Sequence, residues 1–161
     1  MKNIAHLILV PAMLVGFASC QKDENDLTPD LPIDICGIDG MRMKADVDGS
    51  GTCFSASLLG NLADGQLAIG GVNTTGGSLA LLLDDMSPGT HAATDSTNHI
   101  LLLVGGVAYQ STNASPGAIN ISSHDQGSNH IKGSFAGQLA SADGSPAKSI
   151  SGTFDVTYLE Q

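Results

Sequence analysis

The sequence predicts an all-β domain, an antiparallel β-sandwich with a closed β-barrel as the alternative. Short apolar segments are separated by turn dipeptides such as Asp48-Gly49 and Asp64-Gly65. Apolar and polar residues alternate strictly in 118–122 and 154–158, as in strands with one buried face. No stretch of the domain combines helical length with a helical period, and the 20 glycines fit many turns between short strands.

The candidate strands begin at residue 42. They are 42–48, 52–59, 66–72, 78–83, 100–104, 107–112, 118–122, 130–139 and 149–159. The runs 79–83 and 100–104 are continuously apolar, so we expect both of their faces to be covered, at the centre of the core. The figure Ile-x-Gly-Ser/Thr-Phe occurs at 131–135 and again at 150–154, which indicates two neighbouring strands that each bend at the glycine.

The first residues have the pattern of a secretory signal. Lys2 precedes an apolar stretch at 4–17, and small residues stand directly before Cys20. Residues 17–20 resemble the lipobox of bacterial lipoproteins, although Phe17 replaces the usual Leu. The resemblance implies that Cys20 receives a lipid and anchors the chain to a membrane; the alternative is an ordinary secretory signal with an incidental cysteine. We therefore expect a signal peptide at 1–19, a lipidated Cys and acidic flexible tether at 20–35, and the β domain at 36–161.

A charged run without apolar residues follows Cys20 and includes Lys22, Asp23 and Glu24. It resembles the export signal found after the lipidated cysteine in Bacteroidetes lipoproteins. That resemblance implies a lipid-anchored protein on the outer face of the outer membrane. The alternative is a passive solvated spacer, which is the usual role of charge runs.

Most of the chain resembles a family of small Bacteroidetes lipoproteins of unknown function. The resemblance rests on the lipobox, the Pro88-Gly89-Thr90-His91 turn, the strand at 117–121 and the closing Gly-Ser/Thr-Phe strands. His91 stands where relatives commonly carry Tyr. The family implies a β-rich fold and supplies no activity or catalytic residues.

The formal charge of −10 argues against a nucleic-acid partner, because phosphate binding needs clustered Lys and Arg and this chain has six in total. Neither a Gly-x-Ser-x-Gly elbow nor a phosphate-binding glycine loop before a helix is present. We therefore predict no catalytic residues, no cofactor and no enzymatic activity.

Residues 46–51 match the first half of an acidic calcium loop, but Ser57 occupies the twelfth position, where a bidentate acid is expected. A hairpin turn explains these residues, so we predict no metal site. The four histidines beyond the signal show no ligand spacing and are expected to be solvated, in loops or at strand ends; they are His91, His99, His124 and His130.

Two further modifications are suggested by short patterns. Cys36 and Cys53 are either a disulfide, in an oxidising compartment, or two separate buried thiols. Ser96 lies in an Asp-Ser-Thr sequence that resembles the O-glycosylation site of exported Bacteroidetes proteins, with an ordinary turn as the alternative.

Together these features predict a surface-exposed, lipid-anchored, non-enzymatic envelope protein with a role in binding or adhesion. An extracellular protein or a glycan is the expected partner, although few aromatic residues are available to stack on sugars. The alternative is a secreted hydrolase or a β-barrel that carries a small ligand.

Overall fold

The computed structural model describes residues 36–161. The segments 1–19 and 20–35, with Cys20, Lys22, Asp23 and Glu24, lie outside the described residues, so their assignments stay predictions. In the described part, 65% of the residues are in strands and none is in a helix, which confirms the all-β class. Accordingly, residues 36–161 contain no helix that could span a membrane.

The described residues form thirteen strands in chain order. They are β1 (Gly37–Ile38), β2 (Met41–Val47), β3 (Ser50–Cys53), β4 (Ala56–Ala63), β5 (Gln66–Val72), β6 (Ser78–Leu83), β7 (Gly89–Ala93), β8 (His99–Val104), β9 (Val107–Gln110), β10 (Gly117–Asp125), β11 (His130–Ser141), β12 (Lys148–Thr157) and β13 (Leu159–Glu160).

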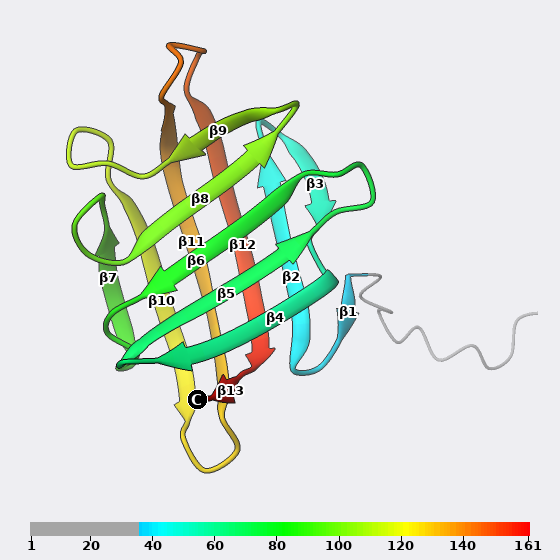
Figure 1. Cartoon of the computed structure of the whole chain (residues 1–161), viewed down its shortest axis with the longest axis vertical. Helices are drawn as coiled ribbons and strands as arrows, with labels where there is room; N and C mark the ends of the chain where they lie inside the picture. Colours follow the sequence, from blue (N-terminus) through cyan, green and yellow to red (C-terminus); the bar gives the residue numbers. More distant parts are fainter. Residues whose placement is uncertain (1–35) are drawn as a thin grey trace, which may run out of the picture. The chain divides into compact units, whose positions relative to one another are not determined.

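The strands make one strongly curled open sheet, a half-barrel. Its main order is β1-β2-β12-β11-β9-β8-β6-β5-β4-β13, while β10 pairs with β11 and β7, and β3 pairs with β2. The long strand β11 links the two parts of the curl, because its first half pairs with β10 and its end pairs with β9. In Figure 1 the strands β4, β5, β6, β8 and β9 run across the face of β10, β11, β12 and β2.

The core lies inside this curl. Leu67, Leu81 and Ile100 are fully buried, as are residues of the facing strands such as Ile131 and Phe154. The two apolar runs therefore do lie at the core. The expectation that both of their faces are covered is wrong for the single chain, because the outward side chains of β6 and β8 are only half-buried or exposed.

The repeated Ile-x-Gly-Ser/Thr-Phe motif places two phenylalanines over two glycines. β11 and β12 are neighbours, with Gly133 opposite Phe154 and Phe135 opposite Gly152. A Cβ on Gly152 would lie 2.4 Å from the Phe135 ring and 2.2 Å from the Lys44 carbonyl oxygen. Gly133 meets the Phe154 ring in the same way. The glycines are therefore required for the close approach of ring and backbone, rather than for the bend that the sequence suggested.

Two parts of the predicted strand pattern differ from the structure. The candidate at 52–59 is two strands, β3 and β4, separated where the Phe54 N–H donates to the Met43 carbonyl. The turn expected at Pro88-Gly89 continues directly into β7, which pairs with β10 over five residues. Both errors fall where the break or continuation depends on contacts between strands distant in sequence.

A disulfide joins Cys36 to Cys53 and ties the start of the domain to β3. Cys36 is buried, and its carbonyl accepts a hydrogen bond from the Ser55 hydroxyl. Ser55 also accepts from the Met43 N–H, 3.1 Å away. The first described residues are thereby fixed to β2 and β3.

Candidate functional site

A polar cleft lies at one end of the half-barrel, where three loops or strand ends meet. It consists of two adjoining hollows of about 410 and 380 Å³ that share Met86, His124 and Gln126. Leu62 and Met86 pack against the core and give the cleft an apolar part. The remaining lining is polar or small: Asp85, Ser87, Pro88, Asn129, Tyr158 and Glu160. Polar groups that converge on a hollow are typical of ligand sites, and the mouth of a curled sheet is a usual place for one. We call this region the end cleft.

A hydrogen-bonded pair lies at the centre of the end cleft. The His124 Nε2 is 2.8 Å from the Tyr158 hydroxyl, and the two rings are tilted by 48°. Tyr158 is almost fully buried, and this burial raises the pKa of its phenol above the ordinary 10.0, with further contributions from the Glu160 and Asp125 carboxylates. The tyrosine therefore stays protonated and can donate or accept a hydrogen bond at neutral pH.

A β-bulge turns His124 into the cleft. Strand β10 shifts register against β11 between Ile121 and Ser123. After the shift His124 pairs with Ile131, whose side chain is fully buried. Since alternate residues of a strand face opposite sides, His124 would point outward without this extra residue. Bulges that redirect a side chain are common beside binding sites.

The loop that forms one wall of the cleft is held by Asn98. The Asn98 amide oxygen accepts from the Asp84 N–H at 2.9 Å, and its amide nitrogen donates to the Ala92 carbonyl at 3.1 Å. Asp84 in turn accepts from the Asn98 N–H and from the Gln66 side chain, which lowers the pKa of the Asp84 carboxyl. Asn98 is buried, so these bonds fix the wall before any ligand arrives.

Carboxylates surround the end cleft. Hydrogen bonds from Ser87 lower the pKa of Asp85, and hydrogen bonds from Ser128 and Gly127 lower that of Asp125. No Lys or Arg is among the lining residues. The cleft is therefore suited to neutral or cationic groups that make hydrogen bonds and unsuited to anions.

One Ser, His and Asp do come together beside the cleft. His91 Nδ1 lies 3.5 Å from the Asp85 carboxylate, while His91 Nε2 lies 2.8 Å from the main-chain oxygen of Ser87. The Ser87 N–H donates to the Asp85 carboxylate at 2.8 Å, so His91 contacts the backbone of Ser87. A nucleophilic serine needs its hydroxyl on the histidine nitrogen, so this group is arranged to hold the loop rather than to attack a substrate.

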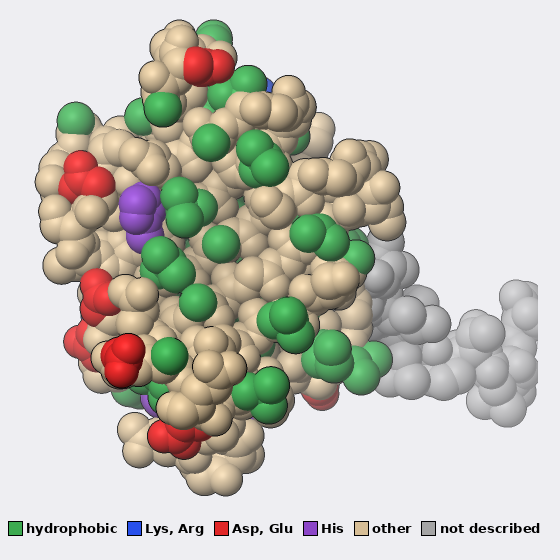
Figure 2. Space-filling model, viewed as in Figure 1, with side chains coloured by type: hydrophobic (Ala, Val, Ile, Leu, Met, Phe, Trp, Pro, Cys, Tyr) green, Lys and Arg blue, Asp and Glu red, His purple; other side chains and the backbone are tan. Residues whose placement is uncertain are grey.

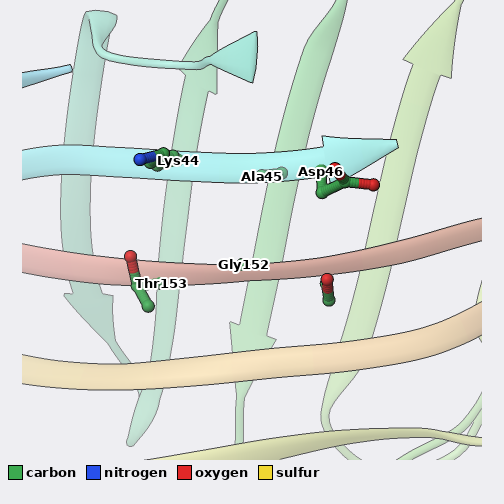
Figure 3. Close-up of a pocket in the computed structure, with 6 residues that line it drawn as sticks. Lys44, Ala45, Asp46, Gly152 and Thr153 are labelled. Atoms are coloured by element: carbon green, nitrogen blue, oxygen red, sulfur yellow. The ribbon is translucent and has the colours of Figure 1, made fainter. Parts of the chain in front are cut away.

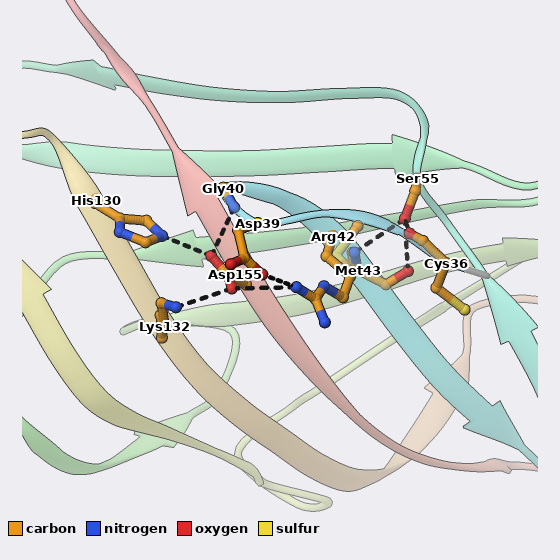
Figure 4. A network of polar contacts seen from close by, with 9 residues as sticks. All are labelled: Cys36, Asp39, Gly40, Arg42, Met43, Ser55, His130, Lys132 and Asp155. Atoms are coloured by element: carbon orange, nitrogen blue, oxygen red, sulfur yellow. Dashed lines mark hydrogen bonds and ion pairs between the residues drawn. The ribbon is translucent and has the colours of Figure 1, made fainter. Parts of the chain in front are cut away.

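A second polar network occupies the outer face of β2, β12 and β11 (Figure 4). Asp155 is 2.5 Å from His130 Nε2, 3.1 Å from Lys132 Nζ and 3.8 Å from the Arg42 guanidinium, and it accepts from the Gly40 N–H. Burial alone would raise the pKa of Asp155, but the hydrogen bonds from His130, Lys132 and Gly40 outweigh burial and lower it. Asp155 thus connects His130, Lys132 and Arg42, and Asp39 is a second carboxylate that pairs with Arg42, so the network has a structural role.

A shallow hollow of about 280 Å³ lies nearby between β2 and β12. Figure 3 shows Lys44 on β2 beside Thr153 on β12 and Ala45 beside Gly152, with Asp46 further along β2. Outward side chains rim the hollow, and the strand backbone at Ala45 and Gly152 forms its base. It has the form of a gap between pleats, without the convergent polar groups of the end cleft.

The acidic loop at 46–51 is a hairpin turn. Asp48 and Gly49 both have positive φ, and the strands β2 and β3 pair on either side of them. Asp46 accepts from the Gly49 N–H, while Asp48 binds Lys148 at 2.7 Å and the Ser149 N–H at 2.9 Å. These carboxylates already have protein partners. Within residues 36–161, no three of the His, Cys, Asp and Glu side chains gather as a metal site would require.

His99 and His130 begin strands β8 and β11, as a position at a strand end predicts, but all four histidines are half-buried, so the expected solvation is wrong. His91, His124 and His130 each have a hydrogen-bonding partner described above, and His99 lies on β8 with its Nε2 buried and unpaired. Ser96 lies exposed in the turn before β8, where its hydroxyl donates to Asp95 and accepts from Asn113. The position is accessible, and glycosylation there stays a prediction.

Comparison of the chain with protein-family models, with curated proteins and with solved structures finds no match. The site must therefore be interpreted from its own geometry.

Proposed function

We propose that this protein is a non-enzymatic, lipid-anchored component of the outer membrane, of the Bacteroidetes lipoprotein type, displayed on the cell surface, whose β domain binds an extracellular ligand in the end cleft. The observation that carries the proposal is the bulge-directed pair of His124 and Tyr158 in a polar-lined hollow with fixed walls. Anchoring through Cys20 and export through Lys22, Asp23 and Glu24 supply the location. We further propose that the two layers of the curled sheet pack as a β-sandwich around a filled core.

The chemistry of the end cleft favours a glycan as the ligand. Amide, imidazole, phenol and carboxylate groups from Gln126, Asn129, His124, Tyr158 and Glu160 can donate to or accept from sugar hydroxyls. No Lys or Arg lines the end cleft, which disfavours a phosphorylated or sulfated sugar. Tyr158 is the aromatic residue of this lining, so we expect recognition chiefly by hydrogen bonds.

An array of neutral glycans probed with the purified protein tests the binding role. Tyr158→Phe removes one hydroxyl and leaves the ring in place, so it should weaken binding by about tenfold, the equivalent of one hydrogen bond. Tyr109→Phe is the matched control, because Tyr109 is a buried tyrosine on β9 outside the cleft lining. If the wild type binds no glycan, or if the two variants bind equally, the proposed glycan site is wrong.

Protease treatment of whole cells tests the location. Replacing Lys22, Asp23 and Glu24 with Ala should leave lipidation intact and protect the protein from external protease, with a known periplasmic protein as the control for leakage. If the triple variant is degraded as readily as the wild type, the charged run is a passive spacer.

The half-barrel shape favours a second candidate, a carrier of an apolar ligand. The inside of the curl is filled by core side chains such as Leu81, Leu102 and Phe135, so an apolar ligand would have to displace them. A fluorescent fatty acid that raised the melting temperature by many degrees would favour the carrier over the glycan-binding protein.

A further inference from the structure

The outer face of β4, β5, β6, β8 and β9 carries no charge. None of the five strands contains Asp, Glu, Lys or Arg, although the chain has a net charge of −10. Figure 2 shows this face with hydrophobic side chains spread across it and acidic groups toward its margins. By strand register its outward residues are Leu59, Asn61, Ala68, Gly70, Val72, Ser78, Ala80, Leu82, His99, Leu101, Leu103, Ala108 and Gln110. We call it the uncharged face.

The opposite side of the half-barrel is different. The outer positions of β2, β11 and β12 carry the ion pairs of Arg42, Lys132 and Asp155. On the uncharged face, by contrast, Leu59 is 67% exposed and Leu103 is 40% exposed. Exposed apolar side chains that gather on a face without charge often mark an interface.

We infer that the uncharged face is the interface of a homodimer, in which two copies of this chain pack face to face. The charge distribution suits a second copy, because two negatively charged chains repel each other least where neither of them presents an ionised side chain. An acidic or basic partner would gain nothing from this face, since it offers no opposite charge. The inference is independent of the ligand proposed for the end cleft.

The arrangement of large and small side chains fits a two-fold axis that lies in the plane between the two copies. The axis runs parallel to the strands, above the gap between β5 and β6. Such an axis exchanges β5 with β6 and β4 with β8. The outward residues Leu59, Gly70, Ala80 and Leu101 lie side by side in one row across β4, β5, β6 and β8. Gly70 of one copy then faces Ala80 of the other at the axis, and Leu59 of one copy faces Leu101 of the other at the flanks. The outer side of a curled sheet is convex, so two copies come closest at the axis and diverge at the flanks. Small residues at the axis and leucines at the flanks fill that shape.

The next row places two polar groups opposite each other. Asn61 Oδ1 and His99 Nε2 are both buried without a hydrogen-bonding partner in the described part of the chain. They belong to one row, Asn61-Ala68-Leu82-His99, at its two ends. The same axis brings Asn61 of one copy opposite His99 of the other, twice. Rotation of the amide and the ring would let each pair form a hydrogen bond across the interface.

The area is sufficient for a specific dimer. Five strands about 4.8 Å apart, each presenting about six residues at roughly 3.4 Å, give a projected face of about 500 Å². Two copies bury about 1,000 Å² of projected area when the leucines at the flanks close the gap and the whole face is in contact, and this area is the lower bound for a specific interface.

Cysteine cross-linking of the full chain in its native membrane tests the dimer. Ala80→Cys places a thiol next to the axis, and Ala136→Cys places a matched thiol on the outer side of β11 in the opposite layer. Packed sheets lie about 10 Å apart, so a short bis-maleimide reagent is used in place of direct oxidation. Cys36 and Cys53 are bonded to each other and do not compete. We expect a species of twice the chain mass with Ala80→Cys, its loss when Leu101→Glu is added, and no such species with Ala136→Cys.

Three results would overturn the inference: no dimer with Ala80→Cys although its thiol reacts after denaturation, equal cross-linking of both cysteine variants, or an adduct of Ala80→Cys with a different protein. Melting temperatures show whether the Leu101→Glu protein is folded; if it is not, Leu103→Glu on the same face replaces it. Whole-cell protease treatment of the same strains separates the two proposals. A protein that is degraded on the cell surface but not cross-linked contradicts only the dimer and leaves the proposed function intact.

Discussion

The glycines under the two phenylalanine rings provide a direct test of the packing between β11 and β12. In Gly152→Ala the new Cβ would lie 2.2 Å from the Lys44 oxygen and 2.4 Å from the Phe135 ring. An ordinary contact needs at least 3.4 Å, so both neighbours must move by about 1 Å, one of them backbone of β2. Overpacking commonly costs about 1–3 kcal/mol, and two clashes that include backbone place Gly152→Ala near the upper end, at about 3 kcal/mol.

Gly51→Ala is the matched control. Gly51 is also a strand glycine, on β3, and a Cβ there has no atom within 4 Å. Its substitution should be neutral or stabilise the domain by about 0.5 kcal/mol, because alanine loses less conformational freedom on folding. Urea denaturation of residues 36–161, followed by circular dichroism, gives both free energies of unfolding.

A second substitution identifies the cause. Phe135→Leu should cost less in the Gly152→Ala background than in the wild type, since the shorter side chain relieves one of the two clashes. If Gly152→Ala costs less than about 1 kcal/mol, or if Gly51→Ala costs as much, the close approach of ring and glycine does not explain the repeated sequence figure.

Four further predictions concern the lipid anchor, the loop at 46–51, the polar network around Asp155 and the disulfide. Cys20→Ser should abolish labelling of the protein by radioactive palmitate, and unchanged labelling would refute the lipid anchor. Millimolar calcium should leave the melting temperature of residues 36–161 unchanged, because the carboxylates of 46–51 are occupied by the protein; a rise of many degrees would show a site. Asp155 has a lowered pKa, so its contribution is complete above the ordinary 3.8 and is lost as the pH falls through the folded value. Urea denaturation should therefore show that Asp155→Asn lowers the free energy of unfolding by about 2 kcal/mol near neutral pH and by progressively less below pH 3.8. A difference between variant and wild type that does not change with pH would contradict this. Replacing Cys36 and Cys53 with Ser should lower the free energy of unfolding by about 3 kcal/mol, measured in the same way. An unchanged free energy of unfolding would show that the disulfide does not stabilise the domain by restricting the unfolded chain.

The sequence predicted those strands best whose pattern is local. β5 and β6 have the expected bounds, because alternation and turn residues on both sides define them. β7 was missed, because its sequence, Gly-Thr-His-Ala-Ala, lacks a strand pattern and the strand depends on pairing with β10. The break between β3 and β4 was missed for a similar reason, since it contains no Gly or Pro. Long-range pairing, which decides both, has no signal in a single sequence.

The end cleft was not predictable from alternation. Period-two counting from Ile121 places His124 on the outside, and only the bulge after Ile121 turns it inward toward Tyr158. Bulges add one residue without a fixed sequence signature, so the histidine's side could not be known before the pairing of β10 with β11 was seen. Asn98 was missed as well, although an Asn with positive φ before a strand is a frequent loop-fixing residue.

The apolar runs of β6 and β8 were expected to be covered on both faces, and a dimer would cover the face that the single chain leaves open. A strand with one solvated face normally alternates, yet Leu101 and Leu103 stand at outward positions where polar residues would be expected. The sequence is therefore that of strands covered on both sides, while the single chain covers one. Either the outward leucines are tolerated as isolated surface residues, or a second layer is supplied from outside the chain. Isolated surface leucines do not explain why five neighbouring strands lack charge, whereas an interface between two acidic chains is least opposed where charge is absent. The lack of charge therefore favours the second explanation, and cross-linking at Ala80 decides between them.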